Sequence, residues 1–314
     1  METSAVNKDL STIHSSVSGL FQQPVSPEEW KQYALSQEQL DFFKKNGYLS
    51  GVKILTDEQV DQLNDELKKM VNPASPGNGL FYEYHGNESQ DPDKVLFHAL
   101  GAWRIAPGFH DILWAPAFRM AAYQLLGGTF RQFHDQLFYK PAGHGGVVAW
   151  HQDYSYWTWT KPMKHLTCWV ALDDANEENG CLYYIPKSQQ WGLLPITGLA
   201  GDMLAVKEVL NDEQKKEFEN RIPNIIKKGY ASFHHPLMMH GSYENRSSRP
   251  RRATVLNVIR DGVVSNMANA NQDLGGFPVI PQDTPMNGQF FPVLFDAEKE
   301  LGSLVSKIPT LKGQ

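Results

Sequence analysis

The first third of the chain has the periodicity of short amphipathic helices. Residues 57–70 follow Thr56, a residue that favours the cap of a helix, and their apolar side chains recur every three or four positions: Val60, Leu63, Leu67 and Met70. Residues 37–45 lie between Ser36, a second potential cap, and Gly47, and residues 115–126 carry Pro116 near the start and Gly127 just after the end. These signals predict three helices.

From Phe130 onward the pattern changes to short runs of β-branched and aromatic residues, separated by Gly, Pro and Asn. A strand-like run also follows the first helix, at residues 48–55. The strands expected in the second half are 130–139, 147–150, 166–172, 181–185, 230–233 and 254–259. The charged segment 202–220 between them predicts an inserted helix.

Helices that precede a series of strands indicate the α+β class, with an antiparallel β core and helical flanks. We expect one domain, because no internal repeat or low-complexity tract divides the chain. Its expected parts are a loosely draped N-terminal arm (1–35), a mainly helical flank (36–128), the β core (129–262) and a C-terminal wrap (263–314).

Composition and charge narrow the possible functions. Lys and Arg total 29 against 35 Asp and Glu, which gives a net charge of −6 and disfavours nucleic acids and membranes as partners. No apolar run approaches the roughly 20 residues that span a bilayer, and the first residues lack the features of a secretory signal. The two cysteines exclude a disulfide scaffold. We expect a cytoplasmic protein.

A candidate metal site begins at His151 and Asp153, where a predicted strand gives way to a loop. Residues i and i+2 of a strand point to the same face, so the imidazole and the carboxylate can converge. Together they supply two of the three ligands in the facial triad of non-haem Fe(II) enzymes. A third ligand must come from a distant strand, and His234, His235 and His240 are the candidates.

A candidate anion site follows the last of these histidines. Arg251 opens a predicted strand eleven residues after His240, and a guanidinium can bind a carboxylate through two parallel hydrogen bonds. An iron enzyme that uses a 2-oxo acid needs a second anchor of this kind for the far carboxylate. Arg251 and the hydroxyl of Ser242 suit that role.

With these motifs the chain resembles the phytanoyl-CoA dioxygenase family of Fe(II)/2-oxoglutarate-dependent oxygenases. The resemblance covers residues 35–262 and includes the phrase that begins at Leu35. Its motifs are His151-Gln152-Asp153, Trp169, Asp173-Asp174, Asn179-Gly180-Cys181-Leu182, Pro186 with Ser188, His240-Gly241-Ser242 with Asn245, and Arg251. Lys187 stands where the family more often has Gly, and this departure affects a turn.

The resemblance implies a double-stranded β-helix, or jelly-roll, core of the cupin type. It implies Fe(II), 2-oxoglutarate and O2 as cofactor and cosubstrates, and hydroxylation of a small organic substrate with release of succinate and CO2. We expect a monomer or a homodimer. The residues that it assigns are metal ligands His151, Asp153 and His240, and cosubstrate-pocket residues Arg251, Ser242, Gln136, Lys140 and Trp169.

The substrate side is less determined by the sequence. The aromatic run directly after Asp153 is interpreted either as a lid over the metal or as buried core: Tyr154, Tyr156, Trp157 and Trp159. Trp103 and Arg104 either face the substrate or pack the N-terminal helices. One or two of the arginines around Arg251 could bind an anionic substrate.

Three alternatives stay open at this point. His235 could replace His240 as the third ligand, although only His240 is followed by Gly and Ser. The chain could be a cupin-like metal enzyme that does not use 2-oxoglutarate, which the position of Arg251 disfavours. It could also be a catalytically silent relative that binds a ligand.

Overall fold

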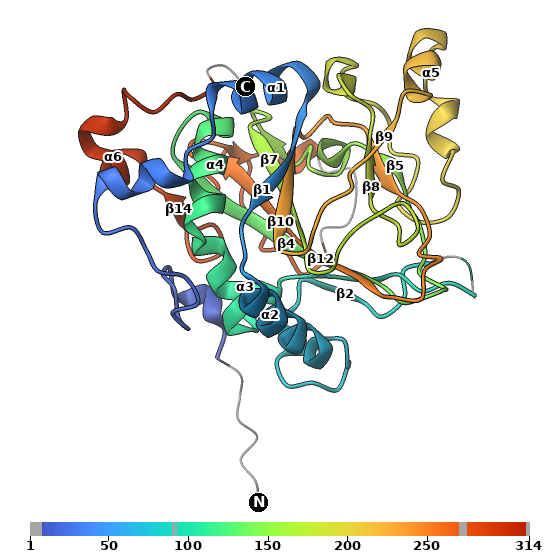
Figure 1. The fold of residues 1–314 in the computed structure, drawn as a ribbon, viewed down its shortest axis with the longest axis horizontal. Coiled ribbons are helices and arrows are strands. Elements are labelled where there is room, and N and C mark those ends of the chain that lie inside the picture. Colours follow the sequence, from blue (N-terminus) through green and yellow to red (C-terminus); the bar gives the residue numbers. More distant parts are fainter. Residues whose placement is uncertain (1–7, 90, 92, 270–274, 312–314) are drawn as a thin grey trace, which may run out of the picture.

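Two antiparallel sheets lie face to face, and helices cover the outer side of the larger sheet (Figure 1). The computed structural model describes residues 8–89, 91, 93–269 and 275–311. The larger sheet has the strand order β1-β10-β7-β12-β4-β3-β2, with β14 paired to β4, and the smaller has the order β5-β11-β8-β9. This architecture confirms the α+β class and the jelly-roll core expected from the resemblance.

The strands of the larger sheet are β1 (Tyr48–Lys53), β2 (Glu83–His85), β3 (Phe97–Leu100), β4 (Phe130–Lys140), β7 (His165–Ala171), β10 (Tyr230–His234), β12 (Arg251–Arg260) and β14 (Val293–Phe295). Those of the smaller sheet are β5 (Val148–His151), β8 (Leu182–Tyr184), β9 (Ile222–Pro223) and β11 (His240–Ser242). A separate ribbon pairs β6 (Thr160–Lys161) with β13 (Val264–Ser265).

The α-helices are α1 (Gln37–Asn46), α2 (Asp57–Met70), α3 (Pro107–Asp111), α4 (Pro116–Leu126), α5 (Asp212–Phe218) and α6 (Ala297–Leu301). The sequence signals for α1, α2 and α4 are confirmed. Ser36 and Thr56 each form a capping box at the start of a helix, and Gly47 ends α1 in the left-handed conformation with φ 80°.

Alternation along β7 explains why the whole strand is buried. Cys168 and Val170 belong to the core beneath the helices, whereas Trp169 and Ala171 face the smaller sheet and pack with its residues. All seven residues of β7 are buried, because the strand is covered on both faces. The inner face is the one that the functional site uses.

One sequence prediction was wrong in extent. The segment 202–220, expected to be one helix, contains a short 3-10 turn, Ala205–Glu208, and the helix α5, which begins only after its N-cap Asn211. Residues 80–112, for which no element was predicted, contain β2, β3 and α3. Strand β11 was not predicted, since three residues around a glycine are too short to show a pattern.

The N-terminal arm is more firmly attached than predicted. Trp30 is 1% exposed and packs in the main core. The buried carboxylate of Asp111 accepts hydrogen bonds from the backbone N–H and hydroxyl groups of Ser18, the hydroxyl of Ser16 and the N–H of Val17. A single acidic side chain thus fixes three consecutive residues, Ser16 to Ser18, in a segment that carries no periodicity of its own.

The described part of the C-terminal segment packs against the β core. Strand β14 pairs with β4, and Phe277, Met286 and Phe291 are buried. Within the described ranges, no helix is both long and apolar enough to cross a membrane.

Candidate active site

Two histidines meet where β5 and β11 pair. His151 ends β5, His240 begins β11, and the two residues are directly opposite each other in the antiparallel register. Their ring centroids are therefore only 4.2 Å apart. This contact joins residues that are distant in the sequence.

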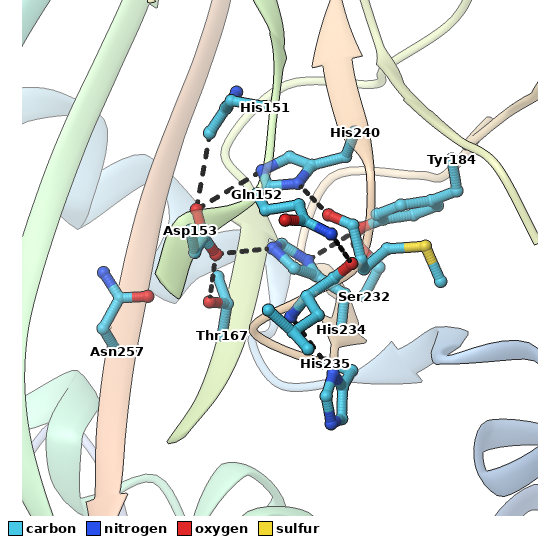
Figure 2. Close-up of polar contacts among 12 residues, drawn as sticks. His151, Gln152, Asp153, Thr167, Tyr184, Ser232, His234, His235, His240 and Asn257 are labelled. Atoms are coloured by element: carbon cyan, nitrogen blue, oxygen red, sulfur yellow. Dashed lines mark hydrogen bonds and ion pairs between the residues drawn. The ribbon is translucent and has the colours of Figure 1, made fainter. Parts of the chain in front are cut away.

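Asp153 completes the group (Figure 2). Its Oδ1 atom lies 3.4 Å from His151 Nε2 and 3.5 Å from His240 Nε2, and the three donor atoms all lie within 4.8 Å of one another. Strand alternation does not explain this convergence, because β5 ends at His151 and Asp153 begins a 3-10 turn, Asp153–Tyr156. The turn brings the carboxylate back over the imidazoles.

Both imidazoles are oriented by backbone carbonyls. His151 Nδ1 lies 2.8 Å from the carbonyl oxygen of Ala149, and His240 Nδ1 lies 2.9 Å from that of Met238. A protonated Nδ1 that donates to a carbonyl leaves Nε2 with its lone pair for a metal. Burial, with the neighbouring His151, also holds the pKa of His240 well below its ordinary value, which keeps the ring neutral. Two neutral imidazoles and one carboxylate fit a mononuclear non-haem Fe(II) centre.

The second oxygen of Asp153 is held by two side chains. Asp153 Oδ2 accepts a hydrogen bond of 2.6 Å from the Thr167 hydroxyl and lies 3.0 Å from His234 Nε2. Burial opposes ionisation of Asp153, but its contacts with His240, His151 and His234 outweigh it and hold its pKa well below the ordinary value. Oδ1 is thereby left facing the two imidazoles.

His234 and His235 have different surroundings (Figure 2). His234 Nδ1 lies 3.2 Å from the hydroxyl of Tyr184, so this histidine bridges Tyr184 and Asp153. His235 instead accepts a hydrogen bond from the N–H of Leu237, and burial lowers its pKa to about 4. The structure brings His240, and not His235, beside His151 and Asp153.

Gln152 fixes the segment between the two predicted ligands. Its side-chain nitrogen donates to the carbonyls of Gly192 and Leu237, and its side-chain oxygen accepts from the N–H of Leu194. This residue is buried, with 2% of its surface exposed. It ties the turn to two other loops.

A buried guanidinium lies farther along the same cavity. Arg251 begins β12, is 1% exposed, and donates to the carbonyl of Gly180 at 3.0 Å and to the Ser242 hydroxyl at 3.2 Å. Its carbon Cζ lies 5.6 Å from the ring centroid of Trp169. Burial lowers its pKa to about 10, so the group stays charged at neutral pH. Among the described residues, no carboxylate forms an ion pair with it.

Lys140 adds a second buried nitrogen. Arg251 and Lys140 are partners in the register of β12 and β4, and Lys140 Nζ donates to the Ser242 hydroxyl and to the carbonyl of Tyr243, both at 2.6 Å. Burial, with the nearby charge of Arg251, moves the pKa of Lys140 well below its ordinary value. Because the Ser242 oxygen accepts from both basic groups, its own proton is available to a ligand. Such a pocket suits an anion.

The metal group and Arg251 line one cavity of about 230 Å³. Gln136 and Trp169, two further residues predicted for the cosubstrate pocket, also line it. Lys140 does not, and it acts on the cavity through Ser242.

The four aromatic residues after Asp153 do not all occupy the same kind of position, so each interpretation made from the sequence applies to some of them. Tyr156, Trp157 and Trp159 line the cavity. Tyr154 does not: it packs against an aromatic cluster that includes Phe133, and its hydroxyl donates to the carbonyl of Thr160.

Trp103 and Arg104 are not brought to the cavity. Trp103 is fully buried in the core beneath the helices. Arg104 pairs with Asp9 at 2.5 Å and lies over the ring of Tyr82. The structure thus places both residues in the packing of the N-terminal region. The arginines near Arg251 are also absent from the described cavity wall, and Arg252 pairs with Asp173 at 2.6 Å.

Several cavity residues could not be found from the sequence. Glu88 and His98 come from the stretch without periodicity, and Phe277 comes from the C-terminal segment. Thr167 could have been found, because it lies two positions before Trp169 and therefore shares its face of β7.

The comparisons with known proteins establish the family. Residues 43–253 match the family Phytanoyl-CoA dioxygenase (PhyH). Phytanoyl-CoA dioxygenase from Arabidopsis thaliana is 23% identical over 265 residues, which cover 72% of this chain and 89% of that protein. A methylphosphonate hydroxylase from Gimesia maris is 25% identical over 237 residues, covering 73% of this chain and 83% of the relative.

Solved structures show the same fold. The non-haem α-ketoglutarate-dependent carbocyclase SnoK from nogalamycin biosynthesis superimposes with a TM-score of 0.68 at 19% identity, over 87% of this chain and all of the other. EctD from S. alaskensis, solved with 2-oxoglutarate and 5-hydroxyectoine, gives a TM-score of 0.58 at 20% identity, over 81% of this chain and 83% of EctD.

The donor set, together with the family match and the relatives, defines the class, a 2-oxoglutarate-dependent non-haem iron dioxygenase. Within that class, the chain belongs to the phytanoyl-CoA dioxygenase family. The family, fold, enzyme class and cofactors expected from the resemblance are confirmed.

Proposed function

We propose that this chain hydroxylates a small organic molecule at the site described above, with release of succinate and CO2. The observation that carries the proposal is the placement in one cavity of a His–Asp–His donor group and a buried guanidinium, with which no carboxylate of the described residues forms an ion pair. This arrangement suits a molecule that is chelated at one end and carries a carboxylate at the other, as 2-oxoglutarate does.

In this proposal His151 Nε2, His240 Nε2 and Asp153 Oδ1 hold Fe(II). The chemistry that the bound metal supplies is activation of O2 coupled to oxidative decarboxylation of 2-oxoglutarate. The carbonyls of Ala149 and Met238 keep the imidazoles in the tautomer that binds metal. Thr167 and His234 restrain Asp153 so that one oxygen faces the metal.

The far carboxylate of 2-oxoglutarate is bound by Arg251 and by the proton of the Ser242 hydroxyl. Lys140 orients that hydroxyl by donating to its oxygen. Gln136 and Trp169 line the pocket, and the ring of Trp169 packs beside the guanidinium.

The aromatic side chains at the cavity mouth exclude water from the reacting centre. Trp157 and Trp159 are 6% and 2% exposed, although both line the cavity. A dry site protects the substrate radical chemistry of this class from side reactions.

The relatives support hydroxylation as the reaction. One is a methylphosphonate hydroxylase, and a protein from Streptomyces griseoviridis that is 28% identical over 188 residues, covering 52% of this chain and 70% of its own length, is an L-proline trans-4-hydroxylase. Their substrates differ in charge and shape, so the reaction class is carried over and the substrate is not.

We also propose that residues 1–314 form one oxygenase domain that works in the cytoplasm as a monomer or homodimer, with no nucleic acid or membrane as partner. The contribution of Phe277 to the cavity supports the single domain. The two free, buried cysteines suit a reducing compartment. The net charge of −6 disfavours binding to nucleic acid.

Succinate formation tests the proposal. Purified protein is incubated with 2-oxoglutarate, O2 and a library of small molecules, with and without Fe(II), beside the variant Asp153→Ala. We expect succinate only with the complete mixture and the parent protein. Substrate oxidation that persists without 2-oxoglutarate supports the cupin-like alternative, and oxidation that persists in Asp153→Ala contradicts the ligand assignment.

A further inference from the structure

The cavity wall also contains a carboxylate, that of Glu88, from a part of the chain far from the metal group in sequence. Glu88, in the connection between β2 and β3, lines the cavity together with Glu83 of β2. The side chain of Glu88 is 23% exposed, and one of its oxygens lies 2.7 Å from His98 Nδ1. Neither the metal group nor the anion pocket uses this carboxylate.

The position of Glu88 is defined by packing beneath it. His98 is 4% exposed, and its ring stacks on Phe138 with centroids 4.4 Å apart and an interplanar angle of 11°. The backbone N–H of Glu88 donates to the carbonyl of Leu96. A side chain that is held by these contacts and lines the cavity is prepared for a ligand rather than for solvent.

The charges of the cavity wall are unequal. Among its described residues Arg251 is the one lysine or arginine, and the proposed function commits that group to the carboxylate of 2-oxoglutarate. Glu83 and Glu88 have no lysine or arginine as an ion-pair partner among the described residues, and each lies beside a histidine. Burial opposes the ionisation of Glu88, but the contact with His98 holds its pKa below the ordinary value, so the group is negative at neutral pH.

Aromatic rings surround the same space. Tyr156, Trp157, Trp159 and Phe277 line the cavity, and the ring of Tyr156 lies 6.0 Å from that of His151. The faces of aromatic rings attract cations, and a carboxylate among them increases that attraction. Together these features disfavour an anionic group in this part of the cavity.

We propose that the substrate carries a cationic nitrogen, such as a protonated amine, which is bound by the Glu88 carboxylate among the aromatic rings of the cavity. This inference rests on the proposed function for the orientation of the substrate toward the metal group. The carboxylate accepts the N–H bonds of the cation, and the rings cover its alkyl substituents.

Calorimetric titration tests the inference with three probes of similar size and different charge: benzylamine, benzyl alcohol and benzoate. The protein is loaded with Zn(II), in place of Fe(II), and with 2-oxoglutarate, which occupies Arg251. We expect the amine to bind at least about tenfold more tightly than the other two, and Glu88→Gln to remove about tenfold of that affinity. Glu58→Gln, which removes an exposed carboxylate at the start of α2, is the matched control and should bind as the parent does.

Two results overturn the inference: benzoate or the alcohol binding as tightly as the amine, or an unchanged preference for the amine in Glu88→Gln. Glu88→Lys provides an independent reading, because it should reverse the preference toward benzoate. Binding of Zn(II) and 2-oxoglutarate is measured separately in each variant. Failure of those two ligands to bind the parent contradicts the proposed function, whereas the loss of amine affinity in Glu88→Gln, measured against the parent on the metal-free protein, still decides the inference.

Discussion

The two carboxylate oxygens of Asp153 have different roles: one faces the metal site and the other holds the side chain in position. Oδ1 faces the two imidazoles, while Oδ2 is occupied by Thr167 and His234. Because the second oxygen is restrained on two sides, the carboxylate has little freedom to rotate away from a metal. Residues that hold metal ligands in this way commonly affect metal affinity, although they do not bind the metal themselves.

Replacing Thr167 tests this support. Thr167→Val keeps the shape of the side chain and removes its hydrogen bond to Asp153, so we expect metal affinity to fall about tenfold while the fold is retained. Thr167→Ser keeps the hydroxyl and should bind metal as the parent does. The measurement is competition for Zn(II) with a chromophoric chelator, and equal affinity in Thr167→Val and the parent would contradict the supporting role.

Arg251 gives a second prediction at this scale. Arg251→Met keeps the bulk and removes the charge, so we expect the KM for 2-oxoglutarate to rise roughly 100-fold because a buried charge pair is lost. Arg252→Met is the matched control: Arg252 is the next residue, but it pairs with Asp173 and should change the KM by less than about twofold. If the two variants behaved alike, Arg251 would not bind the cosubstrate.

At the scale of elements, the site depends on how the strands and turns are joined. The pairing of β5 with β11 brings the two histidines together, and the pairing of β4 with β12 brings Lys140 beside Arg251. The turn before β8 completes the anion pocket, because the carbonyl of Gly180 accepts from Arg251 Nε. Gly180 has φ 78°, and a Cβ atom there would lie 2.5 Å from the carbonyl oxygen of Tyr243.

A substitution in this turn should therefore affect both stability and cosubstrate binding. We expect Gly180→Ala to lower the free energy of unfolding by about 1–3 kcal/mol, and to raise the KM for 2-oxoglutarate because the carbonyl moves away from Arg251. Gly143→Ala is the control. Gly143 has a similar φ of 74° with nothing within 4 Å of an added Cβ, so it should cost only about 1 kcal/mol. Urea unfolding and cosubstrate titration measure the two effects. An unaltered KM in Gly180→Ala would show that the turn does not contribute to binding of 2-oxoglutarate.

The sequence predicted some elements much better than others. Helices α1 and α2 carry both a cap and an apolar stripe, so their limits could be read locally. Strand β11 carries the third histidine, yet its three residues acquire a strand conformation only by pairing with β5 and β8. The role of its histidine could be inferred because the spaced motifs resemble those of a known family. Its strand conformation could not, because it depends on contacts between residues that lie far apart in the chain.

At the scale of the whole molecule, chain segments without periodicity are held by buried polar anchors. Asp111 binds the N-terminal arm, and Glu88 reaches the cavity from a stretch in which no pattern was visible. Sequence reasoning could not place either residue, because a single hydrogen-bonded carboxylate leaves no period in the sequence. The same reasoning placed Trp103 and Arg104 at the substrate as one of two options, and the structure supports the other.

Asp111 also gives a prediction about acid stability. Burial opposes its ionisation, but the hydrogen bonds from Ser16, Ser18 and Val17 hold its pKa below the ordinary value of 3.8. A lowered pKa in the folded state stabilises the fold above about pH 3.8, and this contribution is lost as the pH falls through the lower folded value.

We expect Asp111→Asn to lower the free energy of unfolding at neutral pH by about 1–3 kcal/mol, and the difference from the parent to shrink below about pH 3.8. The exposed Asp41 of α1 provides the control Asp41→Asn, which should have little effect at either pH. Unfolding curves at neutral and acid pH measure the difference. A gap that stays constant down to the most acid condition would contradict the role of the Asp111 charge.

The central claim is that one cavity binds Fe(II) through His151, Asp153 and His240 and 2-oxoglutarate through Arg251. Anaerobic titration of the metal-free protein with Fe(II) and then with 2-oxoglutarate tests it most directly, because the chelate of the two has a weak visible charge-transfer band. The account predicts that the band appears in the parent, is absent in Asp153→Ala, and requires a much higher 2-oxoglutarate concentration in Arg251→Met. Iron binding without the band, or a full band in Asp153→Ala, would contradict it.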